Sequence, residues 1–254
     1  MRKTVLASAL LASFVAAPAV SFAEDAAPAA PAFTSNVTLA SEYIYRGIGQ
    51  TNRKPAIQGG FDYAHSSGLY VGTWASNVSW LSDQAAGTIS SSLEWDFYGG
   101  YKTAIDDFGI DVGVLQYYYP GTGYGAYAQS YNPNTTEGYL AGSWKTLTLK
   151  YSRAFTDLFG FTDSKGSGYL DLTGTYDLGD GFGVVGHVGR QKVQGGLNTS
   201  ASYTDYKIGV TKDFSGTVAA LSYITTNASP TVYTNTFGKD LGNGRVLFSV
   251  TRTF

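Results

Sequence analysis

Apolar and polar side chains alternate most clearly between residues 89 and 102, in ISSSLEWDFYGGYK. One alternate row is mostly apolar and aromatic, whereas the other carries Glu94, Asp96, Lys102 and two serines. Successive side chains of a β-strand point to opposite faces, so the segment predicts a strand with one oily and one polar face. At about 3.3 Å per residue and a tilt of about 40°, it rises about 35 Å, more than a membrane's apolar band of about 25 Å.

The same alternation recurs along the chain and predicts an all-β fold, a twelve-stranded antiparallel up-and-down transmembrane β-barrel. The expected strands are 33–46, 56–64, 69–76, 89–102, 110–119, 136–144, 147–155, 168–178, 182–192, 203–212, 217–226 and 245–254.

The lengths of the connections support a barrel in a membrane. Long and short connections alternate strictly, giving six long loops and five short turns. Outer-membrane barrels have even strand numbers, short periplasmic turns and longer extracellular loops. Twelve strands place both chain ends on the short-turn side. A soluble Tyr-rich sheet would also fit the composition, but it has no reason to sort its connections by length.

The N-terminus predicts export. Arg2 and Lys3 precede an apolar stretch at 5–20, and Ser21-Phe22-Ala23 offers a cleavage site before Glu24, so 1–23 is expected to be a signal peptide. An N-terminal membrane anchor is the alternative, which the short, Ala-rich stretch disfavours. Residues 24–32 are expected to form an Ala/Pro-rich periplasmic tail, and 33–254 the barrel.

The C-terminal residue gives a second indication of the cellular location. Phe254 ends an alternating strand, a pattern we associate with insertion by the barrel-assembly machinery. The expected location is the bacterial outer membrane of a Gram-negative bacterium, with outer-membrane lipid and lipopolysaccharide as neighbours.

Several segments resemble the TorF-type porin family of Gram-negative bacteria. They include SEYIYRG at 41–47, KPAIQGGFDY at 54–63, YVGTWASNV at 70–78, GSGYLD at 166–171 and HVGRQ at 187–191. The resemblance covers most of the mature chain and implies an outer-membrane barrel. It implies no substrate and no catalytic or binding residues.

Composition excludes several functions. The chain has no Cys, so disulfides and thiol chemistry do not operate, and its net charge of −2 with no basic patch argues against nucleic acid as a partner. His65 falls in a predicted turn, and His187 lies in a strand without a catalytic motif beside it. Neither has carboxylates at ligand spacing, so we expect no enzyme, no metal and no cofactor.

The polar rows of the strands supply the candidate pore-lining residues, eight acids and five bases. They are Glu42, Arg46, Asp62, Glu94, Asp96, Lys102, Asp111, Glu137, Lys150, Asp171, Asp205, Lys207 and Arg245. Gln50, Arg53 and Lys54 are expected at the extracellular mouth. The aromatic residues Tyr43, Tyr45, Tyr63, Trp74, Tyr101, Tyr119, Trp144 and Phe155 are expected in the barrel wall or its interfacial girdles.

Two functions remain in competition. In the first, the charges line a narrow channel for the passive transport of small hydrophilic solutes or ions, with a mild cation preference from the acidic excess. In the second, the charges pair into a plug, and a closed structural or surface-interaction barrel acts through loops such as 121–131. Twelve strands lie between filled eight-stranded barrels and open sixteen-stranded ones, so strand number alone does not decide.

Overall fold

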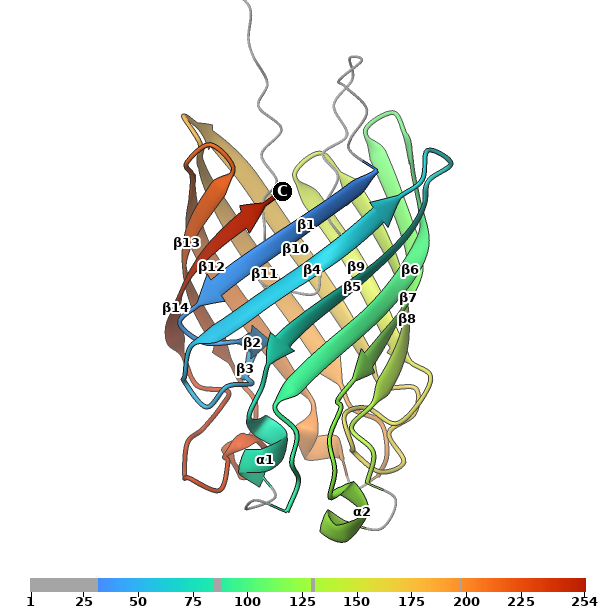
Figure 1. Ribbon diagram of the computed structural model, residues 1–254, viewed down its shortest axis with the longest axis vertical. Helices are drawn as coiled ribbons and strands as arrows, with labels where there is room; N and C mark the ends of the chain where they lie inside the picture. The colour runs from blue at the N-terminus through green and yellow to red at the C-terminus, as the bar shows by residue number, and fades with distance from the viewer. Residues whose placement is uncertain (1–31, 85–87, 129–130, 197) are drawn as a thin grey trace, which may run out of the picture.

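The computed structural model describes residues 32–84, 88–128, 131–196 and 198–254, and within them twelve strands close into an antiparallel barrel (Figure 1). The barrel strands are β1 (Phe33–Ala40), β4 (Ala56–Ala64), β5 (Leu69–Asn77), β6 (Leu93–Ile105), β7 (Phe108–Tyr118), β8 (Thr135–Trp144), β9 (Leu147–Ala154), β10 (Gly168–Gly179), β11 (Phe182–Lys192), β12 (Tyr203–Asp213), β13 (Thr217–Thr226) and β14 (Arg245–Thr253). The predicted fold is confirmed. The expected signal peptide and nearly all of the tail lie outside the described residues.

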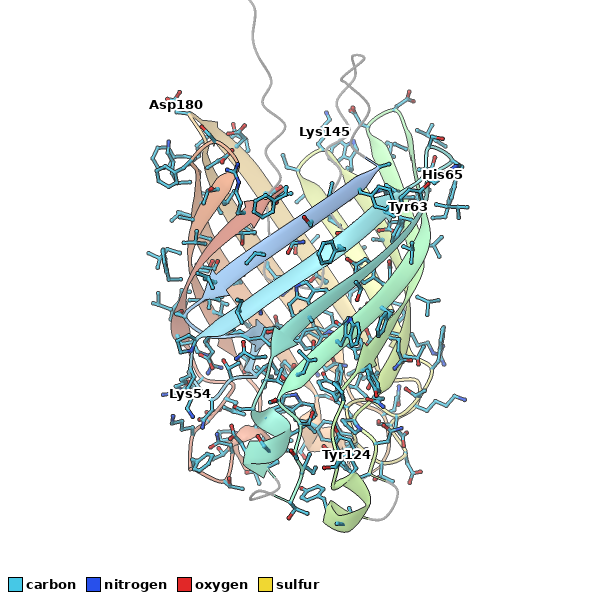
Figure 2. All side chains as sticks on the ribbon, in the orientation of Figure 1. Lys54, Tyr63, His65, Tyr124, Lys145 and Asp180 are labelled. Carbon is cyan, nitrogen blue, oxygen red and sulfur yellow. The ribbon has the colours of Figure 1, made fainter. Side chains whose placement is uncertain are left out.

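Each strand pairs with its neighbour in the sequence, and the circle closes where β1 meets β14, with Leu39 opposite Val250. The connections are sorted as expected (Figure 2): His65, Lys145 and Asp180 mark turns at one end, whereas Lys54 and Tyr124 lie at the other. We call these the short-turn end and the long-loop end. Phe254 lies at the short-turn end, where its backbone N–H donates to Ser35 at 2.8 Å.

The outer face of the wall is apolar. In β6, Trp95, Phe97 and Tyr101 are exposed, whereas Glu94 and Asp96, on the opposite face, are buried. Exposed Leu, Ile, Val and aromatic side chains recur on every barrel strand. Soluble monomers do not expose continuous apolar surface on this scale, so the belt is a lipid-facing surface.

Two strand boundaries differ from the sequence-based expectation by more than three residues. The first strand ends at Ala40 rather than at residue 46, and β6 begins at Leu93 rather than at 89. At the first boundary, Ser41 accepts a hydrogen bond from the backbone of Phe248 at 3.0 Å, and the chain then leaves the wall. The long loops also carry short elements: β2 (Ile44–Tyr45), β3 (Ile48–Gly49), α1 (Trp80–Gln84), α2 (Tyr124–Tyr127), η1 (Thr199–Ala201) and α3 (Pro230–Tyr233). No helix within the described residues is long and apolar enough to cross a membrane.

Candidate solute pathway inside the barrel

The first long loop folds inward, and we call residues 41–55 the inner hairpin. Its strands β2 and β3 pair Tyr45 with Ile48 across a two-residue turn at Arg46 and Gly47, both with positive φ (45° and 78°). Such turns match the twist of a hairpin and favour glycine. A Cβ atom on Gly47 would lie 2.7 Å from the Cβ atom of Asp205, so the turn requires glycine there.

Arg46, at the tip of the inner hairpin, is anchored to the opposite wall. Its guanidinium donates to both carboxylate oxygens of Glu137, at 3.0 and 2.7 Å, and to Gln191 at 2.8 Å. The rings of Tyr45 and Tyr169 lie 4.9 and 4.3 Å from its Cζ atom. Arg46 and Glu137 are almost fully buried, and a two-pronged pair of this kind is geometrically specific. Arg46 therefore fixes the inner hairpin across the lumen.

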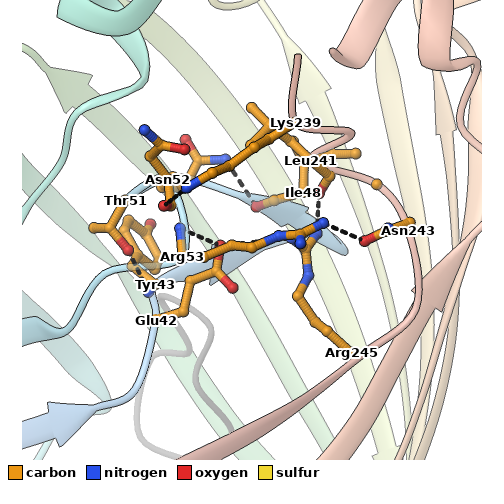
Figure 3. Close-up of polar contacts among 12 residues, drawn as sticks. Glu42, Tyr43, Ile48, Thr51, Asn52, Arg53, Lys239, Leu241, Asn243 and Arg245 are labelled. Carbon is orange, nitrogen blue, oxygen red and sulfur yellow. Dashed lines mark hydrogen bonds and ion pairs between the residues drawn. The ribbon is translucent and has the colours of Figure 1, made fainter. Parts of the chain in front are cut away.

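The base of the inner hairpin is held by the last long loop and by the first residue of β14 (Figure 3). Glu42 lies 3.5 Å from the guanidinium of Arg245 and accepts the backbone N–H of Arg53 at 3.1 Å. The Arg53 side chain reaches Asn243 at 2.9 Å, and the Lys239 ammonium reaches the Asn52 carbonyl at 3.2 Å. Burial raises the pKa of the Glu42 carboxyl, and the positive charge of Arg245 and the Arg53 N–H oppose that rise.

Two adjacent inward carboxylates on β6 differ in their surroundings. Glu94 accepts hydrogen bonds from the hydroxyls of Tyr43 and Tyr119, at 2.7 and 2.8 Å. Asp96 is fully buried, yet neither of its oxygens finds a donor among the described residues. Asp96 lies within electrostatic range of Glu94 and Glu137. Carboxyl groups therefore cluster beside the inner hairpin.

His187 corrects an expectation. The sequence suggested no carboxylates near it, but its Nε2 lies 2.8 Å from Asp205 and its Nδ1 lies 3.2 Å from Asp171. Tyr169 and Thr173 also hydrogen-bond to the ring. The His187 side chain is only 1% exposed, so this is a buried polar network beside the inner hairpin. The described residues hold no group of three or more His, Asp or Glu side chains suited to a metal ion.

Toward the short-turn end the charged side chains are half-buried rather than sealed. Lys102 lies directly opposite Asp111 in the β6–β7 register, and Asp111 accepts from the Tyr70 hydroxyl at 2.5 Å. The Lys150 ammonium lies 4.1 Å from the Tyr139 ring centre, and Asp62 accepts from Tyr98 at 2.6 Å. This part of the lumen keeps charge in contact with solvent.

Glycines let the inward tyrosines lie flat against the wall. A Cβ atom on Gly72 would lie 2.6 Å from the Cζ atom of Tyr98, and one on Gly100 would lie 2.5 Å from the Tyr70 hydroxyl. Each tyrosine covers the glycine of a neighbouring strand, an arrangement that stabilises sheets. This pairing gives one reason why the chain is rich in both residue types.

On the long-loop side of the inner hairpin, which Figure 1 draws at the bottom, the long loops line a cavity of about 320 Å³ that we call the upper cavity because it lies toward the expected extracellular end. Its lining comes from the inner hairpin, α1, the residues Tyr119, Tyr127 and Tyr131, the loops at 155–167 and 227–244, the end of β11 and the start of β12. The aromatic residues that line it are Tyr45, Trp80, Tyr119, Tyr127, Tyr131, Phe159, Phe161, Tyr203 and Tyr233.

Seven of the eight expected wall aromatics divide into two groups, and the eighth, Tyr63 on β4, is half-buried with its ring 4.8 Å from that of Phe33. Tyr101, Trp144 and Phe155 are exposed on the outside, as expected. The placement of Tyr43, Tyr45 and Tyr119 was wrong: Tyr43 and Tyr119 are buried inside, and Tyr45 packs against the same inner cluster. Trp74 lies on the wall strand β5, with its ring packed against that cluster. A strand-like alternation that continues past residue 40 concealed the change of direction.

All thirteen candidate pore-lining side chains are buried or half-buried in the structure. Glu42 and Arg46, however, lie on the inner hairpin and not on a barrel strand, because β1 ends before them. Of the residues expected at the mouth, Arg53 and Lys54 are exposed, whereas Gln50 is buried and lines the upper cavity.

The fold and its surfaces define the class of protein. A closed barrel satisfies all its backbone hydrogen bonds between strands, and its apolar belt matches hydrocarbon. The molecule is thus a transmembrane β-barrel with polar side chains inside.

The chain belongs to the Gcw_chp family, a family of bacterial proteins of unknown function, whose model matches residues 23–254. A bacterial transmembrane barrel of this kind lies in the outer membrane.

Solved porin structures share the fold. The chain is similar to the KdgM porin at 10% identity, with a TM-score of 0.54, over 87% of this chain and 99% of that one. It is similar to the NanC porin at 11% identity, with a TM-score of 0.52, over 88% and 99%. A further match, at 10% identity, a TM-score of 0.52 and coverage of 87% and 98%, is the KdgM porin in complex with disordered oligogalacturonate. No curated protein matches the sequence.

Proposed function

We propose that this protein is a porin, a passive channel for small solutes or ions whose width is set by the inner hairpin. The observation that carries the proposal is the row of inward charged side chains from Asp62 and Lys102 near the short-turn end to Glu94 near the long-loop end. Buried charge is costly unless water or a partner compensates it, and half-buried lysines and aspartates are what a wetted wall requires. The fold shared with KdgM and NanC supports the same proposal.

We also propose the type, the processing, the surroundings and the ion preference of this porin. The chain is a TorF-type porin, as the segments at 41–47 and 54–63 suggest. Its leader at 1–23 is removed on export, and Phe254 takes part in recognition by the barrel-assembly machinery. Lipid and lipopolysaccharide surround the belt, and no chemical reaction takes place. Eight acids against five bases among the candidate residues give a mild cation preference.

A second candidate is a closed structural barrel that acts through its loops. Arg46 favours it, because a two-pronged buried ion pair holds the inner hairpin across the lumen. The two candidates differ in whether water passes around the inner hairpin.

Single-channel recording separates the candidates. The protein, refolded and inserted into a planar bilayer, is expected to give discrete current steps, and Arg46→Met is expected to enlarge them by releasing the inner hairpin. Arg190→Ala is the matched control, because Arg190 is exposed and adjacent to Gln191. No steps in the native protein but steps in Arg46→Met would favour the closed barrel. No steps in either protein would exclude the channel.

A further inference from the structure

The upper cavity presents ring faces and almost no unneutralised charge. Among its lining residues only Arg46 is charged, and Glu137 neutralises it through two hydrogen bonds. A carboxylate or ammonium ligand would lose its hydration there without gaining an opposite charge. The cavity therefore disfavours ionic ligands.

About half of the polar side chains in the lining already have hydrogen-bond partners. The Gln191 amide accepts from Arg46 and donates to the Gly168 carbonyl, at 2.8 and 3.1 Å. The Asn235 amide donates to Asn52 and accepts two backbone N–H groups of its own loop. The Tyr233 hydroxyl donates to the Ala201 carbonyl at 2.6 Å. A heavily hydroxylated ligand would find few partners on these groups.

Other hydrogen-bonding positions in the lining remain open. The hydroxyls of Tyr127, Tyr131, Tyr203 and Thr234 and the amide of Gln84 make no hydrogen bond with the described residues, and the buried Trp80 indole N–H has no acceptor among them. These groups come from α1 and α2, the loop after α2, the start of β12 and the residue after α3. Because they are spread over separate elements around an aromatic lining, they offer single hydrogen bonds to the polar atoms of a ring-containing ligand.

The aromatic rings that line the upper cavity already pack edge to face against one another. Tyr127 and Tyr131 have ring centres 5.0 Å apart at 76°, and Tyr203 and Tyr233 lie 5.2 Å apart at 78°. Trp80 meets Tyr119 at 5.4 Å and 89°. Edge-to-face pairs are the arrangement that an additional aromatic ring would extend favourably. A volume of about 320 Å³ is at the small end of ligand pockets.

We propose that the upper cavity binds an uncharged aromatic molecule that carries one or two hydrogen-bonding groups. Such a molecule would be the solute class of the proposed channel. Only its later passage through the barrel rests on that proposed function. Binding itself requires the cavity alone.

Saturation-transfer NMR on the full protein in lipid nanodiscs tests the proposal with a matched probe series. Benzyl alcohol is the neutral aromatic probe, benzoate and benzylammonium are its charged counterparts, and glucose represents hydroxylated rings. We expect transfer to benzyl alcohol alone. The affinity should fall about two- to tenfold in Tyr131→Ala, which loses a ring, and about two- to fivefold in Tyr203→Phe, which loses only a hydroxyl.

The control is Tyr176→Ala, which removes an exposed ring from the outer face. Equal signals in Tyr176→Ala, Tyr131→Ala and Tyr203→Phe would mean that the probe partitions into lipid, and this would overturn the proposal. Charged probes binding as well as benzyl alcohol, or glucose binding in its place, would also overturn it. The experiment uses no ion current, so a missing conductance would refute the channel and leave this result standing.

Discussion

Charged side chains inside the barrel are compensated differently in the two halves of the lumen. Near the long-loop end, Arg46, Glu137 and Asp205 are nearly fully buried and held by named partners. Near the short-turn end, Asp62 and Lys102 are half-buried, and each contacts a tyrosine ring or hydroxyl. One half is organised like a protein core, and the other like a wetted wall.

Because of this difference, we expect the long-loop half to determine stability and the short-turn half to determine ion selectivity. A buried ion pair is costly to break because the remaining charge is neither paired nor hydrated. A half-buried charge, in contrast, stays hydrated after its neighbour is lost. Substitutions near the inner hairpin should therefore change the free energy of unfolding, and substitutions near the short-turn end should change ion flow.

The largest effect is expected for Arg46→Met. It leaves the Glu137 carboxylate buried without its cationic partner, so we expect a loss of about 3–5 kcal/mol in the free energy of unfolding, measured by urea titration in micelles. The double variant Arg46→Met/Glu137→Gln should recover most of the loss, because neither charge then remains. A single variant within about 1 kcal/mol of the native protein would show that the pair does not organise the long-loop half.

Gly47→Ala is expected to cost about 2–4 kcal/mol in the same titration. The residue has φ of 78°, which costs an alanine about 1–2 kcal/mol, and its Cβ atom would also collide with Asp205. Gly238→Ala is the control, because Gly238 has φ of 72° but open space around its Cβ position. Equal losses in both variants would mean that backbone conformation alone explains the glycine.

A stabilising change is expected at Asp96. Its buried carboxylate has no donor among the described residues, so Asp96→Asn should raise the free energy of unfolding by about 1–2 kcal/mol. Glu94→Gln, on the same face of β6, should lower it, because Glu94 accepts hydrogen bonds from Tyr43 and Tyr119. Changes of the same sign in both variants would contradict this distinction between the two carboxylates.

The wall of this protein could be predicted from its sequence, because alternation and connection length are local properties. Residues 89–102 predicted the faces of β6 correctly from Glu94 to Tyr101, where outward and inward side chains alternate. The inner hairpin was missed because its apolar residues continue the alternation of β1. The signal that was available was Arg46-Gly47 between the apolar pair Ile44-Tyr45 and Ile48, a sequence compatible with a two-residue turn.

The partners of His187 could not be predicted in the same way. Register places Thr173 and Lys207 directly opposite it, so Asp171 and Asp205 are its diagonal neighbours on two different strands. A slip of one residue in either pairing would turn those carboxylates to the other face. The candidate site therefore depends on register, which no local pattern in one strand specifies.

The smallest effect on stability and the clearest effect on flow are expected for Lys102→Gln. Lys102 is half-buried, lies opposite Asp111 and has its ammonium 5.4 Å from the Tyr70 ring centre, so its loss should change the free energy of unfolding by no more than about 0.5 kcal/mol. In a bilayer with a salt gradient, the reversal potential should move toward greater cation preference, because one positive charge leaves the wall while Asp111 stays. Lys145→Gln, which removes an exposed lysine from a turn, should leave the reversal potential unchanged. If Lys102→Gln also leaves it unchanged while stability falls by several kcal/mol, the short-turn half is sealed like the long-loop half, and the contrast between them is wrong.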